Sequence, residues 1–266
     1  MIAESGLPLN GIRVLVTRPE KQSGPLCELI EENGGVALRL PTIELQPPDD
    51  PARAEQLCRR LAEFQIAIFI SSNAVDWAFD LFLDKNAIPD GLAIMAIGAG
   101  TARQIRQYGI NDVSFLEGSA NSEALLELAE LQADTIRGKR VIIFRGQGGR
   151  ELLADGLRKR GALVEYAEVY RRIRPHYKED IIHKIWVDTP PDVIVITSSE
   201  GLENLFTMTA PGDHKFLLHT QLVLIGSRMS GQARQLGFDR LPAIARETSN
   251  RGLLETVIAT VGDGNR

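Results

Sequence analysis

The chain has 266 residues, 44% apolar and 24% charged, which is an ordinary globular composition and long enough for two domains. Its net charge of −5 and lack of a long basic run argue against nucleic-acid binding, because phosphates demand a dense lysine and arginine surface. No apolar run approaches the roughly 18 residues of a membrane helix and no signal-peptide layout opens the chain, so we expect a cytoplasmic protein with no membrane partner.

Short β-branched runs alternate with helical periodicity along the chain. The strands are predicted at Ile12–Thr17, Ile66–Ile70, Ala93–Ile97, Arg140–Phe144, Val193–Ile196 and Leu222–Ile225. A helix is predicted after the first strand, from about Ser23 to Glu32. Nearly continuous apolar strands are typical of a mainly parallel sheet with helices on both faces, so the fold class is α/β.

The second half of the chain repeats the first. Arg145 stands 127 positions after Arg18, and Ser198 stands 127 positions after Ser71, each pair at the end of an apolar strand. Later blocks keep an offset that is longer by one residue. A period this long exceeds the roughly 20–50 residues of a solenoid repeat, so we expect two similar duplicated domains.

Two stretches occupy equivalent places in the repeat and have the character of connectors, near residues 38–50 and 167–180. If both link the domains, the first strand–helix–strand segment packs with the last part of the chain. Residues 1–40 and 173–266 would then form a discontinuous α/β domain, and residues 41–172 an inserted one.

Polar residues recur where predicted strands end, the place where ligands bind in open α/β sheets. Ser71-Ser72-Asn73 and Thr197-Ser198-Ser199 each follow a strand and open a helix. Their hydroxyls could simply cap these helices, or the free backbone N–H groups could bind a carboxylate or phosphate. Recurrence in both halves favours ligand binding.

Three further residues stand at strand ends. Arg18 and Arg145 could each bind a carboxylate through a bidentate guanidinium or form a surface salt bridge. Tyr170 closes the apolar run Leu163–Val169 and could pack or present its hydroxyl to an interdomain cleft. The sequence leaves both alternatives open for each residue.

Several site types are disfavoured by what is missing. Gly98-Ala99-Gly100-Thr101 lacks the third glycine of a dinucleotide loop, and Gly146-Gln147-Gly148-Gly149 lacks the lysine of a phosphate-binding loop. The four histidines are not spaced as ligands on one helical face, so no metal is expected. Cys27 and Cys58 fall on apolar helix positions, which favours buried thiols over a disulfide.

In order and spacing, the motifs together resemble the uroporphyrinogen-III synthase family over nearly the whole chain. They are Thr17-Arg18-Pro19, Ser71-Ser72-Asn73-Ala74-Val75, Ile97-Gly98 with Thr101-Ala102, Val169-Tyr170-Arg171, Thr197-Ser198-Ser199 and Ile225-Gly226. The resemblance implies two α/β domains joined by a two-stranded connector, an active site in the cleft between them, a monomer, and no cofactor.

The resemblance also implies the chemistry: a lyase of tetrapyrrole biosynthesis that cyclises hydroxymethylbilane with loss of water and inversion of the last pyrrole ring, giving uroporphyrinogen III. Tyr170 would assist departure of the hydroxyl, directly or through water. The expected substrate-binding residues are Arg18, Ser71, Ser72, Asn73, Gly98, Thr101, Arg145, Thr197, Ser198, Ser199, Gly226 and Ser227. Met229-Ser230 stands where Thr101-Ala102 would recur, so that hydroxyl is moved or lost.

Two other classes fit a duplicated α/β chain. One is a noncatalytic, two-lobed protein that binds small anions. The other is a two-domain glycosyltransferase, against which the absence of a nucleotide motif counts. A linear tetrapyrrole discriminates among the three, because only the synthase should act on it.

Overall fold

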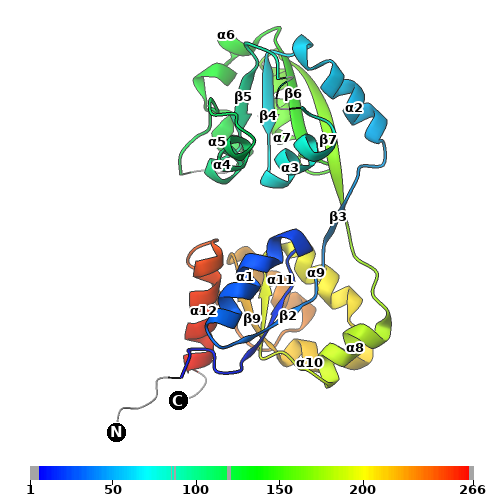
Figure 1. The fold of residues 1–266 in the computed structure, drawn as a ribbon, viewed down its shortest axis with the longest axis vertical. Coiled ribbons are helices and arrows are strands. Elements are labelled where there is room, and N and C mark those ends of the chain that lie inside the picture. The colour runs from blue at the N-terminus through cyan, green and yellow to red at the C-terminus, as the bar shows by residue number, and fades with distance from the viewer. Residues whose placement is uncertain (1–5, 85, 87, 119–120, 264–266) are drawn as a thin grey trace. The chain divides into compact units, whose positions relative to one another are not determined.

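The computed structural model describes residues 6–84, 86, 88–118 and 121–263, and Figure 1 labels its elements. The chain splits into two compact units. The first unit is Met1–Glu44 with Ile173–Arg266, and the second unit is Leu45–Arg172. The chain therefore passes from one unit to the other twice, at Glu44–Leu45 and at Arg172–Ile173.

The first unit contains a five-stranded sheet of order β10-β9-β8-β1-β2, parallel at each pairing. Its strands are β1 (Arg13–Val16), β2 (Val36–Arg39), β8 (Val193–Ile196), β9 (Gln221–Leu224) and β10 (Ala243–Ile244). Its helices are α1 (Glu20–Glu32), α8 (Glu179–Val187), α9 (Ser199–Met208), α10 (His214–His219), α11 (Arg228–Leu236) and α12 (Asn250–Asp263), with a 3-10 turn at Pro211–Asp213. Pairing of β1 with β8 joins the two ends of the chain in one sheet.

The second unit contains a sheet of order β3-β7-β6-β4-β5, in which β4 to β7 pair in parallel. Its strands are β3 (Glu44–Gln46), β4 (Ile66–Phe69), β5 (Ala93–Ala96), β6 (Arg140–Gly146) and β7 (Leu163–Ile173). Its helices are α2 (Pro51–Arg59), α3 (Ser72–Leu81), α4 (Ala99–Gln107), α5 (Ser122–Leu125), α6 (Ala133–Ile136) and α7 (Leu152–Lys159), with 3-10 turns at Leu61–Glu63 and Ala129–Leu131.

The two sheets share one strand order, which confirms the predicted duplicated α/β fold. The order β2-β1-β8-β9 of the first unit matches β7-β6-β4-β5 of the second. Each unit therefore combines the first strand–helix–strand segment of one half with the later strands of the other half. An isolated parallel bridge of Ser114 to Met95 stands where β10 pairs with β9.

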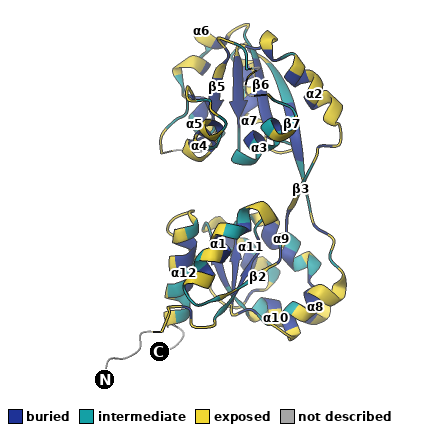
Figure 2. Cartoon of the chain, viewed as in Figure 1, coloured by how far each residue is buried: buried dark blue, intermediate teal, exposed yellow. Residues whose placement is uncertain are grey.

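Helices cover both faces of each sheet. Because alternate residues of a strand point to opposite faces, each strand packs against both layers of helices. In β8, Ile194 and Ile196 pack with α8, α9 and α11, whereas Val193 and Val195 pack with α1 and α12. Figure 2 shows the result as buried strands between helices whose outer faces are exposed. The continuous apolar strands seen in the sequence are explained by this two-sided covering.

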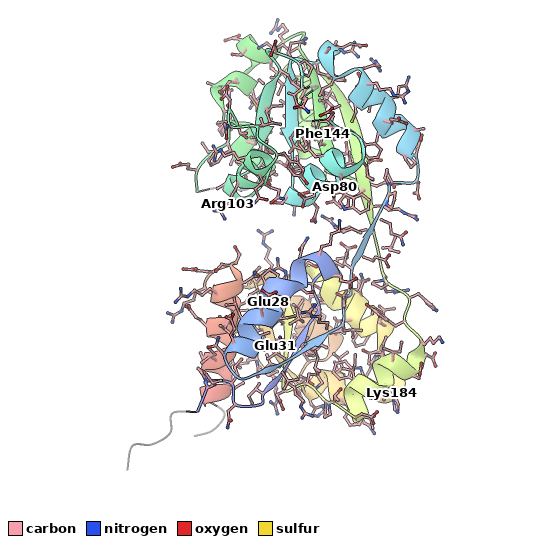
Figure 3. All side chains as sticks on the ribbon, viewed as in Figure 1. Glu28, Glu31, Asp80, Arg103, Phe144 and Lys184 are labelled. Carbon is pink, nitrogen blue, oxygen red and sulfur yellow. The ribbon has the colours of Figure 1, made fainter. Side chains whose placement is uncertain are left out.

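The second unit is built in the same way. Phe69 and Phe144 stack with ring centroids 4.5 Å apart beneath α2, α3 and α4. Figure 3 labels Phe144 among the strands, with Asp80 on α3 and Arg103 on α4. The other face of the same strands packs on α5, α6 and α7.

Residues 41–44, expected to open the inserted domain, lie in the first unit. The Thr42 hydroxyl donates to the Thr17 carbonyl at 3.2 Å, and the Asn204 amide donates to the Thr42 carbonyl at 2.9 Å. These hydrogen bonds join residues 41–44 to the end of β1 and to α9.

The first helix begins earlier than its predicted start at Ser23. The Pro19 carbonyl accepts from the Gln22 and Ser23 backbone N–H groups at 2.8 and 3.1 Å, so α1 already runs from Glu20. Pro19 is the residue before the helix, with a ψ of 144°, and its carbonyl accepts the first hydrogen bonds of the helical turn.

Both cysteines are free and buried, Cys27 on α1 and Cys58 on α2. Burial raises the pKa of Cys58 from its ordinary value of 9.0 to about 12 and also raises that of Cys27. We therefore expect both thiols to resist a thiolate-specific reagent at pH 8 until the chain unfolds. Rapid labelling of the native protein would contradict this expectation.

The raised pKa of Cys58 also predicts a pH dependence of stability. Because the folded state disfavours the Cys58 thiolate, the free energy of unfolding should fall as pH rises from 9.0 towards about 12.

Candidate active site

A hollow of about 350 Å³ lies at the carboxyl edge of the sheet in the second unit. The parallel pairing of β4 with β6 and of β6 with β7 brings the residues that follow β4 and β6 close to the end of β7. Its polar lining includes Ser71, Asn121, Ser122, Arg145, Tyr170 and Arg172. Three residues predicted from the sequence, Ser71, Arg145 and Tyr170, are thus brought together.

The Tyr170 ring lies almost wholly inside the protein, with 1% of the residue exposed. Its hydroxyl lies 3.4 Å from the Ser71 hydroxyl and accepts a hydrogen bond from Arg172 at 3.2 Å. The Trp77 ring lies 6.4 Å away, centroid to centroid. The hydroxyl is therefore held in place and lines the hollow.

A register shift places Tyr170 beside Gly146. Arg145 pairs with Glu168, but the next residue, Gly146, pairs with Tyr170, so Val169 is skipped. Such a bulge re-aims the side chains that follow it. A Cβ atom on Gly146 would lie 2.6 Å from the Tyr170 Cζ, so only glycine leaves room for the ring here.

The serine motifs cap helices, as the simpler interpretation of the sequence held. The Ser71 hydroxyl accepts from the Ala74 N–H at 3.0 Å at the start of α3, and the Ser198 hydroxyl accepts from the Gly201 N–H at 2.9 Å at the start of α9. Ser72 and Ser199 are the first residues of these helices. Other N–H groups of each first turn stay without an intrahelical partner, so capping and anion binding are compatible.

Arg145 is tied to neighbours within the second unit. Only 2% exposed, it donates to the Glu151 carboxylate and to the Gly146 carbonyl, each at 3.1 Å. Its guanidinium also lies over the Tyr166 ring, 4.5 Å from the centroid. A hydrogen bond from Tyr166, and then the bond and charge of Arg145, hold the pKa of Glu151 below its usual range. The salt-bridge interpretation of Arg145 therefore describes its geometry.

Arg18 is held differently in the first unit. It donates to the Asn250 side-chain carbonyl at 2.5 Å, and its buried Nε has no hydrogen-bond partner in the described structure. Burial lowers the pKa of this guanidinium. An unpaired buried donor favours binding of an acceptor such as a carboxylate.

The glycine motifs also follow strands. Gly98 comes after β5, next to Ile97 of the hollow, and Thr101 is 5% exposed in the first turn of α4. Gly226 and Ser227 come after β9, and the Ser227 side chain makes no capping bond to α11. The predicted site residues are divided between the two units. The first unit contains Arg18, Thr197, Ser198, Ser199, Gly226 and Ser227, and the second unit contains the others.

Sequence reasoning missed five polar residues of the hollow: Asn121, Ser122, Glu123, Arg150 and Arg172. Arg172 stands two positions after Tyr170 on a strand, so the two share a face, and this spacing was an available signal. Asn121 caps α5 through its side-chain oxygen and the Ala124 N–H at 2.7 Å.

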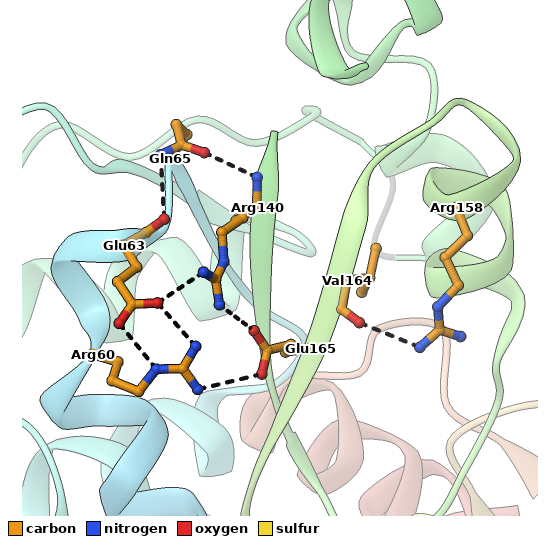
Figure 4. Close-up of polar contacts among 7 residues, drawn as sticks. All are labelled: Arg60, Glu63, Gln65, Arg140, Arg158, Val164 and Glu165. Carbon is orange, nitrogen blue, oxygen red and sulfur yellow. Dashed lines mark hydrogen bonds and ion pairs between the residues drawn. The ribbon is translucent and has the colours of Figure 1, made fainter. Parts of the chain in front are cut away.

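Charges at the opposite, amino edge of this sheet are paired with one another. Arg140 lies 2.8 Å from both Glu63 and Glu165, and Arg60 lies 2.9 Å from Glu63 (Figure 4). These side chains bind each other at the surface. The carboxyl edge is the better candidate for a ligand.

Within the described parts of the chain, no group of three or more His, Cys, Asp or Glu side chains could hold a metal ion. Among the described helices, none is sufficiently long and apolar to span a membrane.

Comparisons with known proteins identify the family. The family model described as uroporphyrinogen-III synthase HemD matches residues 25–255. This chain belongs to the uroporphyrinogen-III synthase family. Its enzyme class is a lyase of tetrapyrrole biosynthesis, so the family and the class predicted from the motifs are confirmed.

Curated relatives and solved structures agree with the family model. Uroporphyrinogen-III synthase of Escherichia coli is 32% identical over 92% of this chain and 99% of its own, and that of Salmonella typhimurium is 33% identical with the same coverage. The structure of a mutant uroporphyrinogen III synthase from Thermus thermophilus covers 95% of this chain and 100% of its own, at 18% identity and a TM-score of 0.61. That from Helicobacter pylori covers 94% and 99%, at 15% identity and a TM-score of 0.59. The structural matches support the fold.

Proposed function

We propose that this chain converts hydroxymethylbilane into uroporphyrinogen III and that the hollow of the second unit carries the dehydration step. The observation that supports this most is the Tyr170 hydroxyl, held by Ser71 and Arg172 at the hollow of a chain from this family. A phenol in this position can donate a proton to a bound substrate.

In the first step, the bond between the hydroxymethyl carbon and its oxygen breaks. The oxygen keeps the bonding electrons, takes the Tyr170 proton directly or across one water molecule, and leaves as water. The pyrrole supplies electrons to the carbon, giving an azafulvene cation. The last pyrrole attacks this carbon at its own substituted position, and a spiro intermediate rearranges. The proton lost at final closure returns to the phenolate, so no cofactor is needed.

The remaining task is positioning, since the uncatalysed closure gives the other isomer. We propose that helix N-termini and hydroxyls at the carboxyl edges hold the acetate and propionate groups of the substrate. This proposed set keeps the residues expected from the sequence: Arg18, Ser71, Ser72, Asn73, Gly98, Thr101, Arg145, Thr197, Ser198, Ser199, Gly226 and Ser227. Backbone N–H groups, hydroxyls and two guanidinium groups at the carboxyl edges would let an acidic chain bind a polyanion.

The proposal includes a monomer in the cytoplasm. Free, buried Cys27 and Cys58 suit a reducing compartment. Light scattering of the purified chain at micromolar concentration would test the monomer, which should give the mass of one chain, 29.3 kDa.

The decisive test of the activity is product identity. The purified chain is given freshly generated hydroxymethylbilane without metal or nucleotide, and the oxidised products are resolved chromatographically. Type III product is expected in excess over a protein-free control, which should yield type I. Type I alone, from a chain shown to be folded by circular dichroism, would overturn the proposal and favour the noncatalytic anion-binding alternative.

A further inference from the structure

Arg172 contacts the candidate catalytic hydroxyl from within the hollow. Its Nη2 donates to the Tyr170 oxygen at 3.2 Å, and its guanidinium carbon lies 5.7 Å from the centre of the tyrosine ring. In the part of the chain that the structure describes, no ion pair joins Arg172 to a carboxylate. The adjacent Arg171 is bound to Asp49 at 2.7 Å and to Gln46 at 3.1 Å.

The direction of this hydrogen bond is fixed, because a guanidinium has donors and no acceptor. Tyr170 must therefore accept from Arg172, and its own proton points elsewhere. The nearest other partner is the Ser71 hydroxyl at 3.4 Å, a long contact whose oxygen already accepts from the Ala74 N–H at 3.0 Å. The phenol proton is thus only weakly held by the protein.

We propose that Arg172 is a positioning residue for Tyr170: its guanidinium occupies the acceptor side of the hydroxyl and turns the O–H proton towards the substrate's departing hydroxyl group. This inference rests on the proposed function. The cation also lies where negative charge develops on the phenol oxygen as the proton leaves, and fixed charge at such a point favours the transition state. Arg172 acts through Tyr170 and takes no proton itself.

A double-mutant cycle on the full chain tests the inference. Arg172→Gln should lower kcat about 10-fold and leave KM within about twofold, because the lost interaction serves the chemical step. Arg172→Lys, which keeps a charged donor, should recover most of that loss. In a Tyr170→Phe background, Arg172→Gln should have no further effect, since the hydroxyl that it orients is gone.

Arg171→Gln is the matched control, because it removes the neighbouring arginine of the same strand, which binds Asp49 and Gln46. Adjacent residues of a strand point to opposite faces, so kcat of this control should stay within about twofold of wild type. Because Arg172 is itself exposed, melting temperatures should confirm that its variants fold.

Three outcomes would overturn the inference. One is a KM increase of the same factor in both tyrosine backgrounds, which would make Arg172 a binder of a substrate carboxylate. The others are unchanged kcat in Arg172→Gln and full activity in Tyr170→Phe. Failure of the proposed function is distinguishable, because the wild-type chain would then make no type III product at all.

Discussion

Tyr170→Phe is expected to lower kcat about 100-fold with KM within about threefold, because general acid catalysis contributes roughly that much or more. The ring is retained, so its packing against Trp77 survives and only the hydroxyl contacts to Ser71 and Arg172 are lost. Steady-state kinetics with freshly prepared hydroxymethylbilane, corrected for spontaneous closure, measures the effect.

The matched control is Tyr166→Phe, four residues earlier on β7. That hydroxyl donates to the Glu151 carboxylate at 2.6 Å and does not line the hollow around Tyr170. Its loss should lower stability only slightly, because the Glu151 side chain is 51% exposed, and should leave kcat within about twofold. Equal turnover of Tyr170→Phe and wild type would remove Tyr170 from the chemical step.

Gly146→Ala should reduce kcat by about 100-fold, since displacement of a catalytic group by about 1 Å costs that much. The added methyl group would lie 2.6 Å from the Tyr170 Cζ and 2.9 Å from its hydroxyl oxygen. The ring is buried and cannot swing into solvent, so β6 or β7 must shift. Overpacking of this kind also costs about 1–3 kcal/mol, which urea unfolding would detect.

Gly231→Ala provides the control for this substitution. Gly231 lies inside α11, and a Cβ atom there would meet nothing within 4 Å. Alanine should raise stability by up to about 1 kcal/mol, because it is the better helix former, and leave turnover unchanged. If Gly146→Ala behaved like Gly231→Ala, the close approach of Tyr170 to the β6 backbone would be contradicted.

The sequence predicted the fold well because its signals are local and repeated. Apolar runs such as Val193–Ile196 are buried on both faces of a sheet, and such strands are readable without tertiary information. The constant spacing between Arg18 and Arg145, or Ser71 and Ser198, indicated duplication. The structure adds that each sheet combines strands from both halves of the sequence: β1 pairs with β8 in one sheet, and β6 pairs with β4 in the other.

The candidate site was predicted less completely, since its geometry depends on tertiary contacts. The bulge that skips Val169 and sets Tyr170 against Gly146 has no signature in residue spacing. Binding of Arg145 to Glu151 depends on how the Gly148-Gly149 turn folds back; both glycines have positive φ, 75° and 102°. The proximity of Arg172 to Tyr170 was readable from strand period, but the direction of their hydrogen bond was not.

The most direct test of ligand binding at the carboxyl edges is to locate the bound product by hydrogen–deuterium exchange. Uroporphyrinogen III, kept anaerobic, is added in excess to the full chain, and amide exchange is compared with that of the free protein. If the carboxyl edges bind the tetrapyrrole, exchange should slow at residues 71–75, 98–102 and 145–150 of the second unit and 198–202 of the first. Protection confined to the amino edges, near residues 63–65 and 192–193, would contradict binding at the carboxyl edges.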